Sequence, residues 1–298
     1  MPRRFVTLDV FTSRRLTGNP LAVVLDSDGL DAGAMQAIAR EFNLPETVFV
    51  LPPSDAGAHA RLRIFTPGRE LAFAGHPTVG TAVLLGALDG NGAAELVLEE
   101  NVGPVRCAVE RVDGERGRAH FEVPQQPRLG GHIADVAELA AALCLTPDDI
   151  GCEDLVPATW SAGNPVTFVP LRGLDAVARA SVDSARWERG FPANARPIAY
   201  VFCRETVEAG HHFHARMFAP ALGIREDPAT GSAAAALAGM LARDGKLADG
   251  THRFTIEQGY EMGRPSLIHL GLTMRAGVLH AATVGGEAVR VLQGTIAA

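Results

Sequence analysis

The sequence predicts an α+β fold made of two pseudo-symmetric domains, each with short strands wrapped around one apolar helix. Two observations predict this fold. The chain of 298 residues repeats itself once, and each half contains several alternating, strand-like segments and one segment that is apolar on nearly all sides. We expect the halves to join near the proline-rich segment 123–127. This gives domains 1–125 and 126–298, and the last strand can return to the first domain.

The repeat consists of three segments that recur in the same order at nearly the same offset. One such pair could arise by chance, but three in order indicate a duplication. The pairs are Gly18–Val24 with Gly163–Val169, Arg63–Pro67 with Arg216–Pro220, and Pro77–Ala82 with Pro228–Ala233. We therefore expect the second half to repeat the topology of the first.

The elements of the first half follow from local patterns. Strands are predicted where short runs rich in β-branched and apolar residues lie between turn signals. They cover Arg4–Val10, Leu21–Leu25, Thr47–Leu51, Ala60–Phe65, Glu95–Glu100, Val105–Glu110 and Arg118–Val123. The segment Asp31–Phe42 has apolar residues at helical spacing and predicts an amphipathic helix. Pro77–Leu88, and Pro228–Ala242 in the second half, predict the buried helices.

Composition and charge exclude several classes of function. The formal net charge is −7, which leaves no electrostatic basis for binding nucleic acid or an anionic membrane. The longest apolar run, Ala233–Ala242, is about half a membrane span, so no transmembrane helix is expected. Four cysteines without C-x-x-C spacing favour a reducing cytoplasm over a disulfide framework, and we expect a cytoplasmic protein.

Several common chemistries also lack their sequence signals. The chain has no G-x-G-x-x-G, P-loop, G-x-S-x-G or H-E-x-x-H motif. Its one lysine, Lys246, lies in a turn-like segment that suits a pyridoxal Schiff base poorly. The run His211–His214 is predicted to be a strand with outward polar positions and no partner carboxylate nearby. We therefore expect no organic cofactor and no metal.

The starts of the two apolar helices are the places where chemistry is expected. His76 and Asp227 are predicted N-caps, each followed by a proline at the first helical position. Uncovered N–H groups and the helix dipole make each start a site for an anion such as a carboxylate. A pseudo-two-fold chain would bring both starts to one cleft. Taken singly, Asp227 is typical of a structural cap, His76 of a structural histidine and Glu46 of a surface turn.

Taken together, these segments resemble the phenazine-biosynthesis PhzF-like isomerases of the diaminopimelate-epimerase-like fold. The resemblance spans the chain and implies two domains, each a curved, barrel-like, mostly antiparallel sheet around a central helix, and a homodimer. It rests on Phe5–Phe11, Gly18–Pro20, Leu44–Thr47, Arg63–Pro67, Phe73–Thr78, Asp227–Ser232 and Met262–Ser266.

The resemblance implies a cofactor-independent isomerase that shifts a proton on a small, carboxylate-bearing substrate. In the phenazine pathway that substrate is trans-2,3-dihydro-3-hydroxyanthranilate. The family's acid/base glutamate falls on Glu46, supported by His76 and Asp227. The expected substrate-binding residues are Asn19, Gly75, Thr78, Gly231 and Ser232.

Two alternatives stay open beside the isomerase. One is a non-catalytic small-molecule binding protein on the same fold. The other is an amino-acid epimerase or racemase, whose fold relatives place a cysteine at the start of each buried helix. No cysteine lies near His76 or Asp227 in the sequence, which disfavours thiol chemistry.

Overall fold

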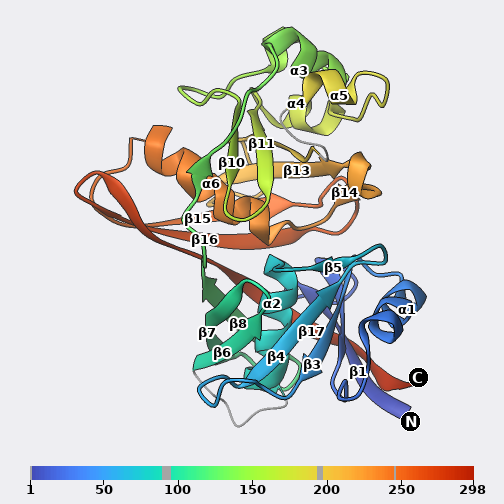
Figure 1. The fold of residues 1–298 in the computed structure, drawn as a ribbon. Coiled ribbons are helices and arrows are strands. Elements are labelled where there is room, and N and C mark those ends of the chain that lie inside the picture. Colours follow the sequence, from blue (N-terminus) through green and yellow to red (C-terminus); the bar gives the residue numbers. More distant parts are fainter. Residues whose placement is uncertain (1, 89–94, 193–196, 245) are drawn as a thin grey trace. The chain divides into compact units, whose positions relative to one another are not determined.

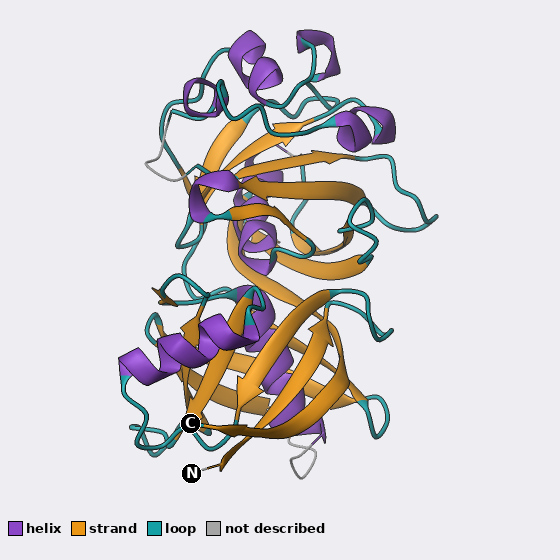
Figure 2. Cartoon of the chain, turned by 90° about the vertical axis from the view of Figure 1, so that its right-hand side faces the viewer, coloured by secondary structure: helices purple, strands orange, loops and turns teal. Residues whose placement is uncertain are grey.

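The computed structural model describes residues 2–88, 95–192, 197–244 and 246–298 (Figure 1). These residues form two compact units. Unit 1 contains Met1–Pro124 and Val284–Ala298, and unit 2 contains Gln125–Thr283. In each unit, strands lie around a central helix, as Figure 2 shows.

Unit 1 is a closed barrel of eight strands. Neighbouring strands pair in the order β1, β2, β3, β4, β6, β7, β8, β17, and β17 returns to β1. The β2–β3 and β4–β6 pairs are parallel. The short strand β5 pairs with β4. The strands are β1 (Pro2–Val10), β2 (Asn19–Val24), β3 (Glu46–Leu51), β4 (Ala60–Phe65), β5 (Glu70–Leu71), β6 (Glu95–Glu100), β7 (Gly103–Arg111), β8 (Arg116–Glu122) and β17 (Val278–Ala297).

The helix inside this barrel is α2 (Gly75–Ala82), which continues as the π-helix η1 (Val83–Leu88). Every residue of α2 is buried, because strands surround it. A Cβ atom at Gly80 would lie 2.6 Å from Leu21 Cδ2, so glycine permits the close approach of helix and strand. Outside the barrel lies α1 (Ala32–Phe42), whose N-cap Asp31 accepts a hydrogen bond from the Ala34 N–H.

Unit 2 repeats the pairing pattern of unit 1. The β10–β11, β12–β13 and β15–β16 pairs are antiparallel, whereas β11–β12 and β13–β15 are parallel. Its central helix is α6 (Gly231–Asp244), and its ten residues Gly231 and Ala233–Leu241 are buried. The strands are β9 (Arg128–Leu129), β10 (Ala158–Ser161), β11 (Pro165–Pro170), β12 (Ala199–Cys203), β13 (Phe213–Ala219), β14 (Ile224–Asp227), β15 (Gly250–Gln258) and β16 (Ser266–Arg275).

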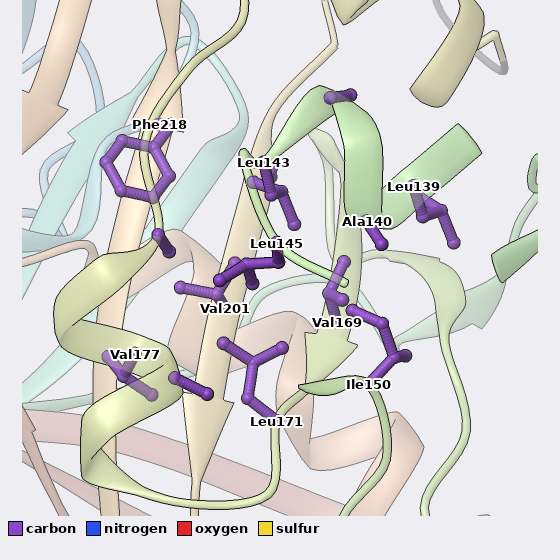
Figure 3. Packing of buried hydrophobic residues seen from close by; sticks show 14 of the residues in the cluster. Leu139, Ala140, Leu143, Leu145, Ile150, Val169, Leu171, Val177, Val201 and Phe218 are labelled. Atoms are coloured by element: carbon purple, nitrogen blue, oxygen red, sulfur yellow. The ribbon is translucent and has the colours of Figure 1, made fainter. Parts of the chain in front are cut away.

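Short helices cover the face of unit 2 away from α6. They are α3 (Val136–Ala142), α4 (Leu174–Arg179) and α5 (Trp187–Gly190). Two 3-10 turns also occur in unit 2: η2 (Pro147–Asp149) follows α3, and η3 (Pro220–Leu222) lies between β13 and β14. Leu139, Leu143 and Val177 pack against Val169 and Val201 of the sheet (Figure 3). This cluster is a second core layer beside the one that α6 fills.

The structure corrects the predicted helix starts. We expected His76 and Asp227 as N-caps, with Pro77 and Pro228 at the first helical positions. Instead Ala74 caps α2, so His76 is its second residue. Helix α6 begins at Gly231, and Asp227 ends β14. The local proline pattern was misleading because Asp227 is paired in a strand.

The helix starts also correct the third repeat pair. Counted from the first helical residue, Gly75 and His76 of unit 1 correspond to Gly231 and Ser232 of unit 2. The prediction that His76 and Asp227 occupy matching positions is therefore wrong. The duplication itself is confirmed by the shared order of parallel and antiparallel strand pairs.

Candidate active site

Unit 1 brings together a carboxyl group and an imidazole. Glu46 is the first residue of β3 and lies opposite Leu21 in the parallel β2–β3 pair. Its Oε2 atom is 3.2 Å from Nε2 of His76, in the first turn of α2. The side chains are 13% and 6% exposed, respectively. Glu46 is thus not the surface turn residue that its local sequence suggests, and at 3.2 Å one proton can be shared between the two atoms.

The imidazole of this pair is uncharged at neutral pH. Burial lowers the pKa of His76 to about 3, although the Pro20 carbonyl accepts a hydrogen bond from the ring and partly opposes this effect. That carbonyl belongs to β2, next to Asn19, whose side chain is fully buried. The ring is therefore oriented by one strand and faces the carboxyl group of the next.

The start of α2 offers backbone N–H groups beside His76. Gly75 and His76 are the first two helical residues and Pro77 is the third, so two N–H groups have no acceptor within the helix. The first helical bond is made by the Thr78 N–H to the Ala74 carbonyl. Such a start favours an anion, through the N–H groups and the helix dipole together.

Unit 2 gathers the other predicted residues around the start of α6. Thr230 precedes Gly231 and Ser232, and its carbonyl accepts the N–H groups of Ala233 and Ala234. The Thr230 hydroxyl donates to Asp227 Oδ2 at 2.5 Å. Asp227 is 8% exposed. A buried Asp227 carboxyl group therefore contacts the threonine that directly precedes α6.

Sequence reasoning missed the polar residues beneath the two helix starts. Gln258, the last residue of β15, accepts from the Thr230 N–H and donates to Thr230 Oγ1 and the Asp227 carbonyl. Glu100, the last residue of β6, lies 2.7 Å from Thr78 Oγ1. Both look like ordinary strand-end residues in the sequence. Only an alignment of the two halves extended through β6 and β15 could have singled them out.

The prediction for His211–His214 is also wrong. His214 is 1% exposed, and its ring nitrogens lie 2.8 Å from Glu257 Oε2 and 2.9 Å from Glu261 Oε1. His211 contacts the other oxygen of Glu257 at 2.7 Å. The carboxylates that we judged absent come from β15 and the turn after it, more than forty residues later in the chain. Histidines and carboxylates here form a buried hydrogen-bonded cluster.

In the described parts of the chain, no group of three or more His, Cys, Asp and Glu side chains has an arrangement that could hold a metal ion. None of the helices in those parts is long and apolar enough to cross a membrane.

Comparisons with known proteins agree with this architecture. The chain is 51% identical over 298 residues to an uncharacterized isomerase of Mesorhizobium japonicum, covering 99% of this chain and 98% of the relative. It is 38% identical over 294 residues to the trans-2,3-dihydro-3-hydroxyanthranilate isomerase of Pseudomonas chlororaphis, covering 98% of each. The crystal structure of a PhzF-family phenazine biosynthesis protein of Bacillus anthracis superposes with a TM-score of 0.87 at 28% identity, covering 100% of both chains.

These likenesses place the protein among the isomerases that share the diaminopimelate-epimerase-like fold, so the predicted fold and enzyme class are confirmed. More particularly, the chain belongs to the phenazine biosynthesis-like family PhzC-PhzF, whose model matches residues 8–294.

Proposed function

We propose that this protein is a cofactor-independent isomerase that shifts one proton within a small, carboxylate-bearing substrate, such as trans-2,3-dihydro-3-hydroxyanthranilate or an analogue. The observation that supports this most directly is the buried Glu46–His76 pair, with 3.2 Å between Oε2 and Nε2. The name of the Pseudomonas chlororaphis relative supports the substrate class.

In the proposed reaction, Glu46 accepts a proton from one substrate carbon. The electrons of that C–H bond move into the adjacent π system, and Glu46 returns a proton to a second carbon. Substrate and product then have the same composition, so no oxidant, reductant or second reactant is needed. Between the two transfers, the protonated Glu46 carboxyl group is proposed to donate a hydrogen bond to the bare Nε2 of the uncharged His76 ring, which keeps the carboxyl group oriented.

The proposed anchor for the substrate carboxylate is the pair of N–H groups at Gly75 and His76. Asn19 is proposed to contact the substrate beside them. As the family resemblance implies, Gly231 and Ser232 are proposed as substrate-binding residues and Asp227 as a catalytic residue. The Thr78 hydroxyl is already engaged by Ala74 and Glu100, so its contribution is to the shape of the helix start.

A thiol-dependent epimerase fits the helix starts poorly. The positions before the first helical residues are Ala74 and Thr230. Cys107, Cys152 and Cys203 are buried, and Cys144 is exposed beyond the end of α3. We also propose a cytoplasmic homodimer, as the family resemblance implies.

The test is turnover of Glu46→Gln on trans-2,3-dihydro-3-hydroxyanthranilate and related acids. Glutamine keeps the size of the side chain but cannot cycle a proton, so kcat should fall by about 10²–10⁴-fold while substrate affinity changes little. The matched control is Glu95→Gln, an exposed acid of unit 1 at the start of β6. Near-normal kcat in Glu46→Gln would show that another group carries the proton. Binding of these acids without turnover by the wild type would favour the non-catalytic alternative.

A further inference from the structure

Glu100 is a buried acid that the proposed proton transfer does not use. It ends β6, is 7% exposed and pairs with Gly103 of β7. Its Oε1 atom lies 2.7 Å from Thr78 Oγ1, and its Oε2 atom has no hydrogen-bond partner among the described residues. No ion pair joins it to any cation within those residues. A buried carboxylate without a compensating charge is costly, which calls for an explanation.

The hydroxyl of Thr78 makes short contacts with two oxygen atoms. Its oxygen lies 2.7 Å from Glu100 Oε1 and 2.8 Å from the carbonyl oxygen of Ala74. A hydroxyl has one hydrogen and can donate fully to only one of these acceptors. If Glu100 were ionised, one of the two short contacts would join two oxygens with no hydrogen between them. A proton on Glu100 satisfies both contacts.

The surroundings of Glu100 favour this proton. Burial raises the pKa of Glu100 to about 8, and the Thr78 hydroxyl only partly opposes the shift. The nearby thiol of Cys107, on β7, is itself uncharged, because burial and the proximity of Glu100 raise its pKa to about 12. The unpartnered Oε2 atom is also tolerated better on a neutral acid than on a carboxylate.

Unit 2 has an uncharged side chain at the position equivalent to Glu100. In the parallel β4–β6 pair, Arg61 lies opposite Glu99; in the equivalent β13–β15 pair, His214 lies opposite Glu257. One residue further along, Glu100 therefore corresponds to Gln258. The Gln258 amide donates to Thr230 Oγ1 at 2.9 Å, and that hydroxyl donates to Asp227. The same register position is thus occupied by an uncharged donor that contacts a threonine at the start of the central helix.

We infer that Glu100 is a positioning residue for the active site, acting as an uncharged acid that donates to Thr78, which donates in turn to the carbonyl of Ala74. Ala74 is the N-cap of α2, directly before Gly75 and His76. The chain of two hydrogen bonds fixes the turn that presents the imidazole to Glu46. The inference rests on the proposed function for its catalytic consequence, but the proton on Glu100 can be tested without any substrate.

The first experiment measures that proton by infrared spectroscopy. The wild type at pH 7 should show a protonated-carboxyl band that is missing in Glu100→Gln, and raising the pH through about 8 should remove it. Glu95→Gln, the control at the exposed start of the same strand, should leave the band unchanged. If no band depends on Glu100 at pH 7, the carboxyl group is ionised and the inference is wrong. This result is independent of whether Glu46 is the acid/base residue.

The second experiment measures pH profiles of kcat on a confirmed substrate. Glu100→Gln keeps an uncharged donor and should match the wild type near pH 7. Above pH 8 the wild type should lose activity as Glu100 ionises, and by pH 9.5 the glutamine variant should be about ten-fold more active. Glu100→Ala, which removes the donor, should lower kcat on the order of ten-fold at pH 7 with a smaller change in KM.

The outcomes separate the two proposals. Identical alkaline limbs in the wild type and Glu100→Gln would overturn the positioning role. Should Glu100→Ala fail to fold, the glutamine variant still decides the question. Turnover by Glu46→Gln would instead refute the proposed function, and it would leave the infrared result on Glu100 unaffected.

Discussion

The two units share one strand order but carry different groups at equivalent positions around the central helix. Glu46 begins β3 of unit 1, whereas the corresponding position of unit 2, just before β12, is Ile198. The second helical residue is His76 in α2 and Ser232 in α6. At these two positions, the acid and the imidazole therefore occur together in unit 1 and not in unit 2. The two units share the order of strand pairs but not this pair of side chains.

In both units, a glutamate side chain holds a loop by accepting hydrogen bonds from two backbone N–H groups. Glu99 of β6 accepts hydrogen bonds from the N–H groups of Ser54 and Asp55, in the loop between β3 and β4. Glu257 of β15 accepts from the equivalent loop of unit 2, between β12 and β13. The loop anchors therefore match in the two units, whereas the residues at the helix starts differ.

The largest effect on kcat is expected from replacing the second residue of each central helix by alanine. His76→Ala removes the partner of Glu46 and should lower kcat by about 10²-fold or more. Ser232→Ala removes a single hydroxyl, which corresponds to about 1 kcal/mol, and should mainly raise KM. Steady-state kinetics of both variants on one substrate measures the difference. Equal losses of kcat would contradict the assignment of proton transfer to unit 1.

A smaller effect is expected for the arginine–glutamate pair that recurs in both units. Arg63 binds Glu70 at 2.7 and 2.6 Å, and the pair is partly exposed. Arg216 binds Glu226 at 2.8 and 2.9 Å, is 10% exposed and also donates to the Val177 carbonyl. Because the Arg216–Glu226 pair is more deeply buried, removing one of its partners should cost more free energy of unfolding than removing a partner of the Arg63–Glu70 pair.

We therefore expect Arg216→Met to lower the free energy of unfolding by about 3 kcal/mol, and Arg63→Met by about 1 kcal/mol. Urea unfolding of the two variants checks this. If both lose the same amount, the deeper burial of Arg216 adds no stability.

The smallest effect is expected for the pH dependence of the stability that His214 contributes. Burial works to lower the pKa of His214, but hydrogen bonds to Glu261 and Glu257 outweigh it, so the pKa is raised. Burial works to raise the pKa values of both carboxyl groups, but hydrogen bonds outweigh it, so both values are lowered. For Glu257 these bonds come from backbone N–H groups and from the histidines, and for Glu261 the bond from His214 dominates. A raised histidine pKa gives stability that is present below its ordinary value of 6.5 and is lost as the pH rises through the folded value.

The lowered pKa values of Glu257 and Glu261 stabilise the folded protein at pH values above the ordinary carboxyl pKa of 4.5. His214→Gln should therefore destabilise most between pH 4.5 and 6.5, by about 1.5 kcal/mol, and less above. Arg61→Gln, at the equivalent register of unit 1, is the control and should show no such dependence. Denaturation at pH 6 and pH 9 measures both; a constant loss for His214→Gln would contradict the charged cluster.

Local patterns predicted the strands well, because alternation and turn residues lie within a few positions of each other. Ala60–Phe65 and Glu95–Glu100 have the predicted bounds. The amphipathic helix also formed, with Asp31 as its cap. By contrast, the start of α6 was misplaced because a paired strand occupies the residues before Asp227, and strand pairing is not visible in one sequence.

Residues whose role depends on distant partners were the hardest to predict. His214 meets Glu257 and Glu261 only because β13 and β15 are parallel neighbours. Glu46 was singled out by the family resemblance alone, since nothing in Leu44–Thr47 distinguishes it from a turn residue. Its contact with His76 depends on α2 threading the barrel, which no local pattern describes.

The strand β17 has a consequence for how the chain is made. It begins in unit 2, continues into unit 1 and completes the first barrel between β8 and β1. During synthesis, the edges of β1 and β8 therefore wait for Val284–Ala297 to leave the ribosome, after all of unit 2 has been translated. Exposed strand edges invite pairing with other chains, and long-range pairing is slow. Unit 2 can thus acquire its fold first although it is encoded second, and the growing chain needs protection of its N-terminal half until the last strand arrives.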